Sequence, residues 1–317
     1  MLQYIVRRLL AMIPLLILIT AFVFIIGQYG AGDLAGYLTI SQNGGKMDPA
    51  IYASYRLRLH LDDPIFLRYG AWLFNAIQGD LGVSYASTGE PGVTHLIAQA
   101  LPISLQLGLA ALVMVLVFGI LLGIIAALFK NTIIDYVIVG VVTVLSSIPL
   151  FVLAPLALYF LVIQMHIIPT VGIGWHGLFS QESIMPVVIL AANSCLTTVR
   201  FTRASVLEVL GQEYIRAAYA KGLPTWKVIT KHILKNALIP VLSVTGLTAS
   251  YLLGGSLFLE LVFNIQGFGL LAYNSLKAGD LQAMTGIILV TAILIILINL
   301  ATDLLYKWAD PKVKFSR

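Results

Sequence analysis

Cysteine and charged residues are both scarce in this sequence. One cysteine, Cys195, occurs in 317 residues, so the chain can form no internal disulfide and no metal cluster built on thiolates. Only 10% of the residues are charged, whereas a typical soluble domain carries roughly a quarter. With 59% hydrophobic residues and a mean hydropathy of +0.96, most of the chain is predicted to lie in a lipid bilayer.

The sequence signatures of common enzymes are absent as well. There is no H-E-x-x-H or G-x-S-x-G motif, and no paired Cys or His at metal-ligand spacing. The segment Gly44-Gly45-Lys46 lacks the earlier glycine of a phosphate-binding loop. We therefore expect no catalytic residue, no metal site and no cofactor bound by this chain. The Lys and Arg residues form no basic stripe with interleaved aromatics, so we expect no nucleic-acid partner.

Long apolar runs dominate what is present. A helix needs roughly 20 residues to cross a bilayer core about 30 Å thick. Six regions are free of Asp, Glu, Lys and Arg over such a length or nearly such a length: Leu9–Tyr29, Leu101–Phe129, Tyr136–Ile163, Ser183–Val199, Asn236–Leu259 and Leu281–Thr302. The first is too long for the apolar part of a secretory signal, and no cleavage site stands out, so it is read as an uncleaved helix. The sequence predicts an all-α integral membrane protein with six transmembrane helices.

The basic residues outside these runs predict the orientation of the chain. Fourteen Lys and Arg fall on the side of the two termini and five on the other. Because basic residues are retained in the cytoplasm, both termini of this multi-pass protein are predicted to be cytoplasmic. The expected organisation is a first transmembrane helix over 1–30, a small helical external region over 31–98, and a transmembrane core over 99–317 that includes a cytoplasmic loop over 200–236.

Turn signals divide the external region. Asp48-Pro49 and Asp62-Asp63-Pro64 favour two short amphipathic helices, over Pro49–Leu61 and Pro64–Ile77. A lid packed on the helix ends and a docking surface are both consistent with such a region.

Polar groups inside the spans bear on how a solute could pass. No acid or base lies within the six spans, which weakens a proton-coupled carrier mechanism. Pro149 and Pro155 each remove a helical hydrogen bond and can kink the third span. Candidates for pore-facing positions are Ser146, Ser147, Pro149, Asn193, Ser194 and Thr197. Interhelical hydrogen bonding is the competing interpretation for the polar side chains, and close helix packing is the interpretation for Gly254-Gly255.

The most informative segment is Glu213–Pro224 in the cytoplasmic loop. Good helix formers run to Lys221, Gly222 can adopt the left-handed closing conformation, and Pro224 can open a second helix. Two alanines, Ala217 and Ala218, would let another surface approach the backbone closely. Charge around this contact would come from Arg216, Lys221, Lys227 and Lys231.

This segment resembles the coupling loop of the inner-membrane permeases of binding-protein-dependent ABC importers, of the dipeptide, oligopeptide and nickel type. That family carries E-A-A-x-x-x-G there; Arg216-Ala217-Ala218 and Gly222 keep the spacing but replace the leading Glu. Further matches, in order, are Tyr4–Leu10, Gly79–Gly82, Leu101–Gly123, Ser147–Pro149, Thr202–Ser205, Asn236–Pro240, Gly254-Gly255, Asp303–Tyr306 and Asp310-Pro311. The resemblance places the ATPase contact at Glu213, Tyr214, Arg216, Ala217, Ala218, Lys221, Gly222, Leu223 and Pro224.

The resemblance also implies the fold and the partners. It implies a type I permease fold in the cell inner membrane, a second homologous permease subunit, two ATP-binding subunits that hold ATP and Mg, and an extracytoplasmic substrate-binding protein. It leaves the substrate open among dipeptide, longer peptide, glutathione, nickel chelate and oligosaccharide. A stand-alone channel or secondary carrier is the alternative function, and a membrane anchor for another complex is a third.

Overall fold

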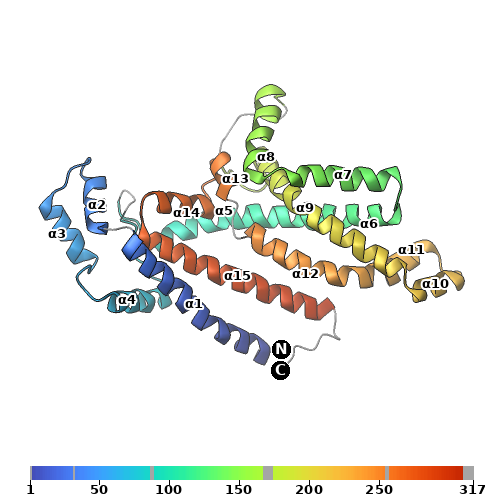
Figure 1. The fold of residues 1–317 in the computed structure, drawn as a ribbon, viewed down its shortest axis with the longest axis horizontal. Coiled ribbons are helices and arrows are strands. Elements are labelled where there is room, and N and C mark those ends of the chain that lie inside the picture. Colours follow the sequence, from blue (N-terminus) through green and yellow to red (C-terminus); the bar gives the residue numbers. More distant parts are fainter. Residues whose placement is uncertain (1, 31–32, 86–88, 167–173, 254–256, 310–317) are drawn as a thin grey trace. The chain divides into compact units, whose positions relative to one another are not determined.

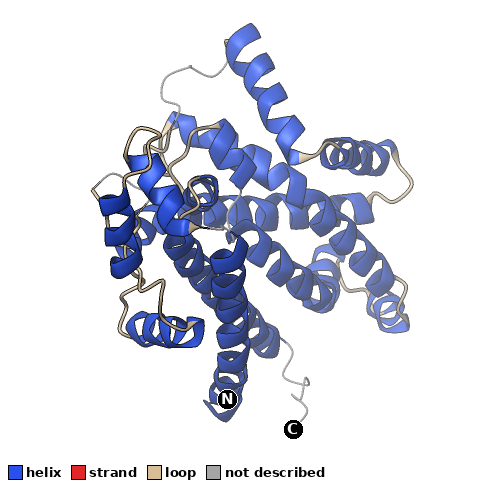
Figure 2. Ribbon diagram, turned by 60° about the vertical axis from the view of Figure 1, so that its left-hand side comes forward, coloured by secondary structure: helices blue, strands red, loops and turns tan. Residues whose placement is uncertain are grey.

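The computed structural model describes residues 2–30, 33–85, 89–166, 174–253 and 257–309, and within these ranges the regular secondary structure is helical apart from one isolated bridge between Val83 and Gly92 (Figure 2). The chain forms two compact units. The first comprises residues 1–103 and 266–296, and the second comprises residues 104–265 and 297–317.

The first unit begins with the long helix α1 and three shorter helices (Figure 1). These are α1 (Leu2–Gly30), α2 (Leu34–Gln42), α3 (Pro49–Arg58) and α4 (Ile65–Ile77). The Asp33 carboxylate accepts a hydrogen bond from the Gly36 N–H (3.1 Å), and the Asp48 carboxylate accepts one from the Ala50 N–H (2.8 Å), so both acids cap helix starts. The two predicted amphipathic helices correspond to α3 and α4, whereas α2 was not predicted.

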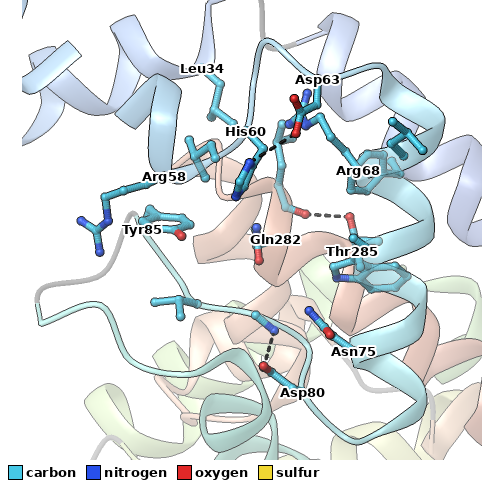
Figure 3. Close-up of a pocket in the computed structure, with 18 residues that line it drawn as sticks. Leu34, Arg58, His60, Asp63, Arg68, Asn75, Asp80, Tyr85, Gln282 and Thr285 are labelled. Atoms are coloured by element: carbon cyan, nitrogen blue, oxygen red, sulfur yellow. Dashed lines mark hydrogen bonds and ion pairs between the residues drawn. The ribbon is translucent and has the colours of Figure 1, made fainter. Parts of the chain in front are cut away.

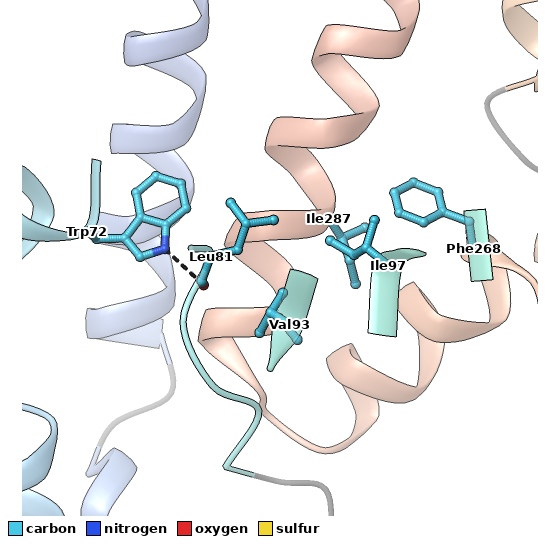
Figure 4. Close-up of a cluster of buried hydrophobic side chains, with 7 residues drawn as sticks. Trp72, Leu81, Val93, Ile97, Phe268 and Ile287 are labelled. Atoms are coloured by element: carbon cyan, nitrogen blue, oxygen red, sulfur yellow. Dashed lines mark hydrogen bonds between the residues drawn. The ribbon is translucent and has the colours of Figure 1, made fainter. Parts of the chain in front are cut away.

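The core of the first unit joins α4 to helices that come from distant parts of the sequence. Trp72 packs with Leu81, Val93, Ile97, Phe268, Ala283 and Ile287 (Figure 4). These residues come from α4, the loop after it (Leu81), the start of α5 (Val93–Met114), α14 (Phe268–Lys277) and the start of α15 (Leu281–Ala309). The Asp280 carboxylate accepts a hydrogen bond from the Ser84 hydroxyl (2.5 Å) and one from the Ala283 N–H (3.1 Å), which fixes the start of α15.

The second unit contains the remaining helices. They are the end of α5, the π-helix η1 (Val115–Gly119), α6 (Ile120–Leu128), α7 (Ile133–Ser147), α8 (Leu150–Ala157), η2 (Leu158–Gln164), α9 (Gln181–Leu210), α10 (Glu213–Ala220), α11 (Thr225–Val228), η3 (Ile229–Ile233), α12 (Leu234–Leu253), α13 (Leu257–Val262) and the end of α15. Helix α9 is central, because it packs against α6, α7 and α12 (Figure 1).

The candidate membrane spans agree with the prediction of an all-helical membrane protein. Four described helices are long and apolar enough to cross a bilayer: Ile5–Gly27, Val93–Leu128, Gln181–Leu210 and Leu281–Leu305. Two further helix pairs meet the criterion only when each bent pair is counted as one span, which brings the total to six. The helix that contains the fourth predicted span, Ser183–Val199, is α9, which continues for three turns beyond Val199.

The third predicted span is not one straight helix. Helix α7 ends at Ser147, Ile148 is extended, and the chain turns by 99° before the segment Leu150–Gln164. Pro149 occupies the position before α8 and cannot donate a helical hydrogen bond, so the break lies where proline makes it least costly. Pro155 lies inside α8, which passes into the π-helix η2. Residues Gly254-Gly255 and the sequence from Asp310 onward lie outside the described residues.

Two glycines one helical turn apart let α9 approach the α5–α6 segment closely. A Cβ built on Gly123 would lie 2.6 Å from Thr202 Cβ and 2.8 Å from the Val199 carbonyl oxygen, and one on Gly119 would lie 2.9 Å from Thr198 Cβ. Thr198 and Thr202 are fully buried, and their hydroxyls have no hydrogen-bond partner within the described ranges. The contact is therefore one of small-residue packing, as is common between membrane helices.

This packing predicts the effect of adding one methyl group. Gly123→Ala should destabilise the protein by about 1–3 kcal/mol, because the new Cβ meets the α9 backbone and α9 must shift. The matched control is Gly140→Ala in α7, where the Cβ meets nothing within 4 Å. There alanine should be neutral, or stabilising by up to about 1 kcal/mol. Thermal unfolding in detergent compares the two, and equal melting temperatures would contradict the proposed packing.

Candidate functional site

The loop that follows α9 folds as a helix, a tight turn and a second helix. Helix α10 ends at Ala220, Gly222 has a φ of +76°, and the Gly222 N–H donates to the Tyr219 carbonyl (2.9 Å). The N–H groups of Lys227 and Val228 then donate to the Pro224 carbonyl (2.9 and 3.1 Å), which starts α11. A left-handed φ favours glycine strongly, so the closing role predicted for Gly222 is confirmed.

One face of this loop is anchored to the ends of the membrane helices. Ile215 and Ala218 of α10 are buried with Val228 and Ile233 of the second helix. The same cluster includes Ala127 at the end of α6, Val206 on α9 and Ala237 on α12. Burial of this apolar surface holds the loop to three elements of the second unit, so the loop cannot swing freely.

Two polar contacts strengthen the anchor. The Ser205 hydroxyl on α9 donates to the Ala237 carbonyl on α12 (2.7 Å), and both groups are buried. The Asn236 side-chain amide donates to the Tyr214 hydroxyl on α10 (3.1 Å) and to the His232 carbonyl (2.9 Å). Through these bonds, a displacement of α10 would be transmitted to α9 and α12.

The opposite face of α10 is exposed. Glu213, Arg216, Ala217 and Ala220 recur at intervals of three and four residues, which places them on one side of the helix, and all four are exposed. Tyr219 and Trp226 are also exposed, the latter at 67%. Ala218, in contrast, is buried in the anchor. Of the two predicted contact alanines, the structure therefore leaves only Ala217 open to a partner.

The predicted pore-facing positions fall into two groups. Ser146 and Ser147, at the end of α7, both donate to the Thr143 carbonyl in their own helix (3.1 and 2.7 Å), so their hydroxyls are engaged beside the break at Pro149. Asn193, Ser194 and Thr197 lie on consecutive turns of α9; Ser194 is buried, Asn193 is half-buried and Thr197 is exposed. The predicted positions therefore lie on α7, on α9 or at the start of α8. That they face a pore stays a prediction.

A partly buried ion pair that sequence reasoning missed links α7 to α9. The Arg203 guanidinium donates two hydrogen bonds, from Nε and Nη2, to the two oxygens of Asp135, both at 2.7 Å. The Asp135 carboxylate also accepts a bond from the Asn131 N–H (3.0 Å), and its side chain is 2% exposed. In the sequence, Asp135 precedes the third predicted span by one residue and Arg203 follows the fourth by four residues, so no local pattern pairs them.

A buried acid lies immediately after the fifth predicted span. Glu260 on α13 is fully buried, and its carboxylate accepts a hydrogen bond from the Ser104 hydroxyl on α5 (2.6 Å). The fifth predicted span ends at Leu259, one position before this acid. This hydrogen bond between two buried polar groups fixes how α5 and α13 align along their lengths.

The described residues contain no group of three or more His, Cys, Asp or Glu side chains able to hold a metal ion. The candidate site is therefore the helical loop of α10 and α11, which has one exposed face and is anchored to the membrane helices α6, α9 and α12.

Comparison with known proteins identifies the family. Residues 119–315 match the model of the binding-protein-dependent transport system inner membrane component, and residues 1–108 match the model of the N-terminal part of such membrane components. The chain belongs to this family. It is a multi-pass inner-membrane permease, the non-catalytic membrane component of an ABC transport system, and the predicted resemblance is confirmed.

Relatives match over almost the whole length. The chain is 34% identical to the glutathione transport system permease protein GsiC of Escherichia coli, over 99% of this chain and 100% of that protein. It is 35% identical, with the same coverage, to the oligopeptide transport system permease protein OppB of Escherichia coli. Among solved structures, the inward-facing MetNI methionine ABC transporter matches with a TM-score of 0.56 and 20% identity, over 68% of this chain and 96% of that chain. That match supports the fold of an ABC importer membrane subunit.

The Asp135–Arg203 pair predicts a measurable loss of stability. Asp135→Ala leaves the Arg203 charge without its partner and should lower the melting temperature by about 5 °C. The control is Asp62→Ala, which removes the Asp62–Arg56 ion pair at an exposed site and should lower it by less than about 2 °C. Melting curves in detergent measure both. If the two variants melt alike, the pair between α7 and α9 contributes no more than a surface contact.

Proposed function

We propose that this chain is the pore-forming permease subunit of an ATP-driven importer that translocates peptides or a similar small solute. An extracytoplasmic binding protein would deliver the solute. The substrate class is supported by the two relatives named above, since glutathione and oligopeptides are both peptides, at 34% and 35% identity.

The proposed complex contains a second homologous permease subunit, two ATP-binding subunits and the binding protein, all in or at the inner membrane. ATP and Mg would be held by the ATP-binding subunits and not by this chain. Both termini and the loop over 200–236 would be cytoplasmic, and the segment over 31–98 would be external. A transmembrane helix over 1–30 and a permease core over 99–317 complete this organisation.

The observation that carries the proposal is the exposed face of α10. A soluble helix that leaves a row of small and charged residues open, while its other face is anchored to α6, α9 and α12, can receive a partner and pass on its movement. Glu213, Tyr214, Arg216, Ala217, Lys221, Gly222, Leu223 and Pro224 would form the docking surface and its turn. Ala218 would hold that surface to the membrane helices.

The translocation path is proposed to pass the break between α7 and α8. Backbone carbonyls freed at Pro149 are tolerated in a membrane only where they line a cavity or are covered by protein. Ser146 and Ser147 lie at this break, and together with Asn193, Ser194 and Thr197 on α9 they would line the path with Pro149.

Isolation of the complex tests the partners. Tagged protein purified in mild detergent should bring with it an ATPase and a second permease. Gly222→Trp should lose the ATPase, because a tryptophan at a φ of +76° is strained and changes the turn. A wild-type protein that purifies alone, and transports its solute without ATP, would point instead to a channel or secondary carrier.

A substitution at Ala217 tests the docking face separately from the turn. Ala217→Trp places a bulky side chain on the exposed face of α10 without changing the anchor. Uptake should fall on the order of tenfold, which corresponds to a loss of about 1.4 kcal/mol in docking. ATP hydrolysis should no longer respond to substrate. The measurement is ATP-dependent uptake into proteoliposomes that contain the whole complex.

Two controls separate docking from folding. Ala53→Trp introduces the same side chain at an exposed position of α3 and should leave uptake within twofold of wild type. Thermal unfolding should show that Ala217→Trp is folded. Normal coupling in folded Ala217→Trp protein would remove the α10 face from the mechanism.

A further inference from the structure

Helix α4 of the first unit is attached to the middle of a membrane-spanning segment. The Tyr69 hydroxyl donates to the Ile17 carbonyl (2.9 Å) and shares a hydrogen bond with the Thr20 hydroxyl (2.8 Å). The Tyr69 ring also meets the Phe24 ring edge-on at 5.6 Å. Since the apolar span of α1 runs from Ile5 to Gly27, these contacts place α4 alongside the second half of that span. A helix at that depth contacts lipid as well as water.

The outward face of α4 suits such a position. Phe66, Leu67, Phe74 and Ile77 are between 59% and 79% exposed, and their spacing puts them on one side of the helix. Only 6% of the neighbouring α1 span is buried, so the apolar face of α4 continues an uncovered apolar surface. Exposed apolar area of this size is unfavourable in water and favourable against acyl chains.

A cavity of about 450 Å³ lies beside α4 in the same unit (Figure 3). Apolar side chains such as Phe24, Leu34 and Trp72 line it, together with the basic residues Arg58, His60 and Arg68 and the carboxylates of Asp63 and Asp80. Leu281 and Thr285, from the first turns of α15, complete the wall. The end of α1 meets the start of α15 there, because a Cβ on Gly27 would lie 2.8 Å from Leu281. The cavity therefore lies at the ends of two candidate spans, where lipid headgroups are expected.

Arg68 differs from the other arginines near this cavity. The Arg58 guanidinium is bound by both oxygens of Glu90 (3.1 and 2.5 Å), and Arg56 is paired with Asp62. Arg68 lies over the Phe24 ring (5.9 Å), and no hydrogen bond or ion pair engages it in the part of the chain that the structure describes. Burial lowers the pKa of Arg68, and the nearby Asp63 carboxylate only partly opposes this, so an anion in the cavity would stabilise the charged form.

We propose that this cavity binds the phosphate group of a membrane phospholipid, with Arg68 as the phosphate ligand and with α4 embedded in the leaflet beside it. A guanidinium matches a phosphate with two parallel hydrogen bonds. The apolar wall accepts the glycerol end of the acyl chains, and the outward face of α4 contacts the neighbouring lipids. The site would fix α4, and with it the segment over 31–98, to the membrane surface. It does not depend on which solute is transported.

Binding to Arg68 is tested on the full chain purified in detergent. Native mass spectrometry with added phosphatidylglycerol should show one retained phospholipid, and Arg68→Ala should weaken its apparent affinity on the order of tenfold. Arg68→Lys should retain part of the binding. The control Arg56→Ala removes the same charge from an exposed, paired site and should stay within twofold of wild type. Equal lipid retention by Arg68→Ala and wild type would overturn the site.

Two additional titrations distinguish the source of the anion. Inorganic phosphate alone should not compete with phosphatidylglycerol, because the apolar wall contributes to lipid binding. A dipeptide should not compete either. Displacement of the lipid by the dipeptide would assign the cavity to a solute carboxylate and overturn the lipid proposal, whereas displacement by inorganic phosphate would restrict it to a free-anion site.

The depth of α4 gives an independent measurement. In a Cys195→Ser background, nitroxide labels are placed at Ile77 on α4 and at Leu57 on α3, which are 79% and 74% exposed. In phosphatidylglycerol–phosphatidylethanolamine nanodiscs, the Ile77 label should be accessible to oxygen and protected from a water-soluble nickel chelate. The Leu57 label, between Arg56 and Arg58, should show the reverse. An Ile77 label as accessible to the chelate as Leu57 would place α4 in water, and protection from both reagents would indicate a covering protein subunit.

Discussion

Hydrocarbon offers no hydrogen bonds to a polypeptide backbone, and this constraint governs most of the structure. Each spanning segment must satisfy its own N–H and C=O groups, so the described spans are helical. The same constraint explains where helices are interrupted. The chain breaks at Pro149, where one N–H is already missing, and it widens into π-turns at η1, η2 and η3 without leaving the helical path.

With the backbone satisfied within each helix, the arrangement of helices depends on a few side-chain contacts. Gly119 and Gly123 bring α9 close to its neighbours, and the Asp135–Arg203 pair and the Ser104–Glu260 hydrogen bond fix two further helix pairs. Apolar side chains cannot do this alone, since they interact with lipid about as well as with one another. The specificity of the bundle therefore rests on its small and polar residues.

The same division of roles is found in two helices that do not span the membrane, α10 and α4. In the loop after α9, an apolar cluster around Ile215 and Ala218 fixes α10 to α9 and α12, and the charged and small residues remain on the open side. In α4, Trp72 and Tyr69 pack inward, while Phe66 and Ile77 face outward. The outward faces differ in chemistry, so the proposed partners differ too: a protein surface for α10 and lipid for α4.

The sequence alone was enough to determine the membrane class, the family and the turn at Gly222. It also predicted six spans, which is within the range of four to six found in the described residues. Each depends on local composition or on residues close together along the chain, such as the twenty-residue apolar runs and Ala217-Ala218 with Gly222. Only the tertiary structure decided that Ala218 is buried while Ala217 is open, that Arg203 pairs with Asp135, and that Glu260 meets Ser104. These contacts join residues that are up to 156 positions apart, and no pattern within one helix specifies which side of it a distant helix will cover.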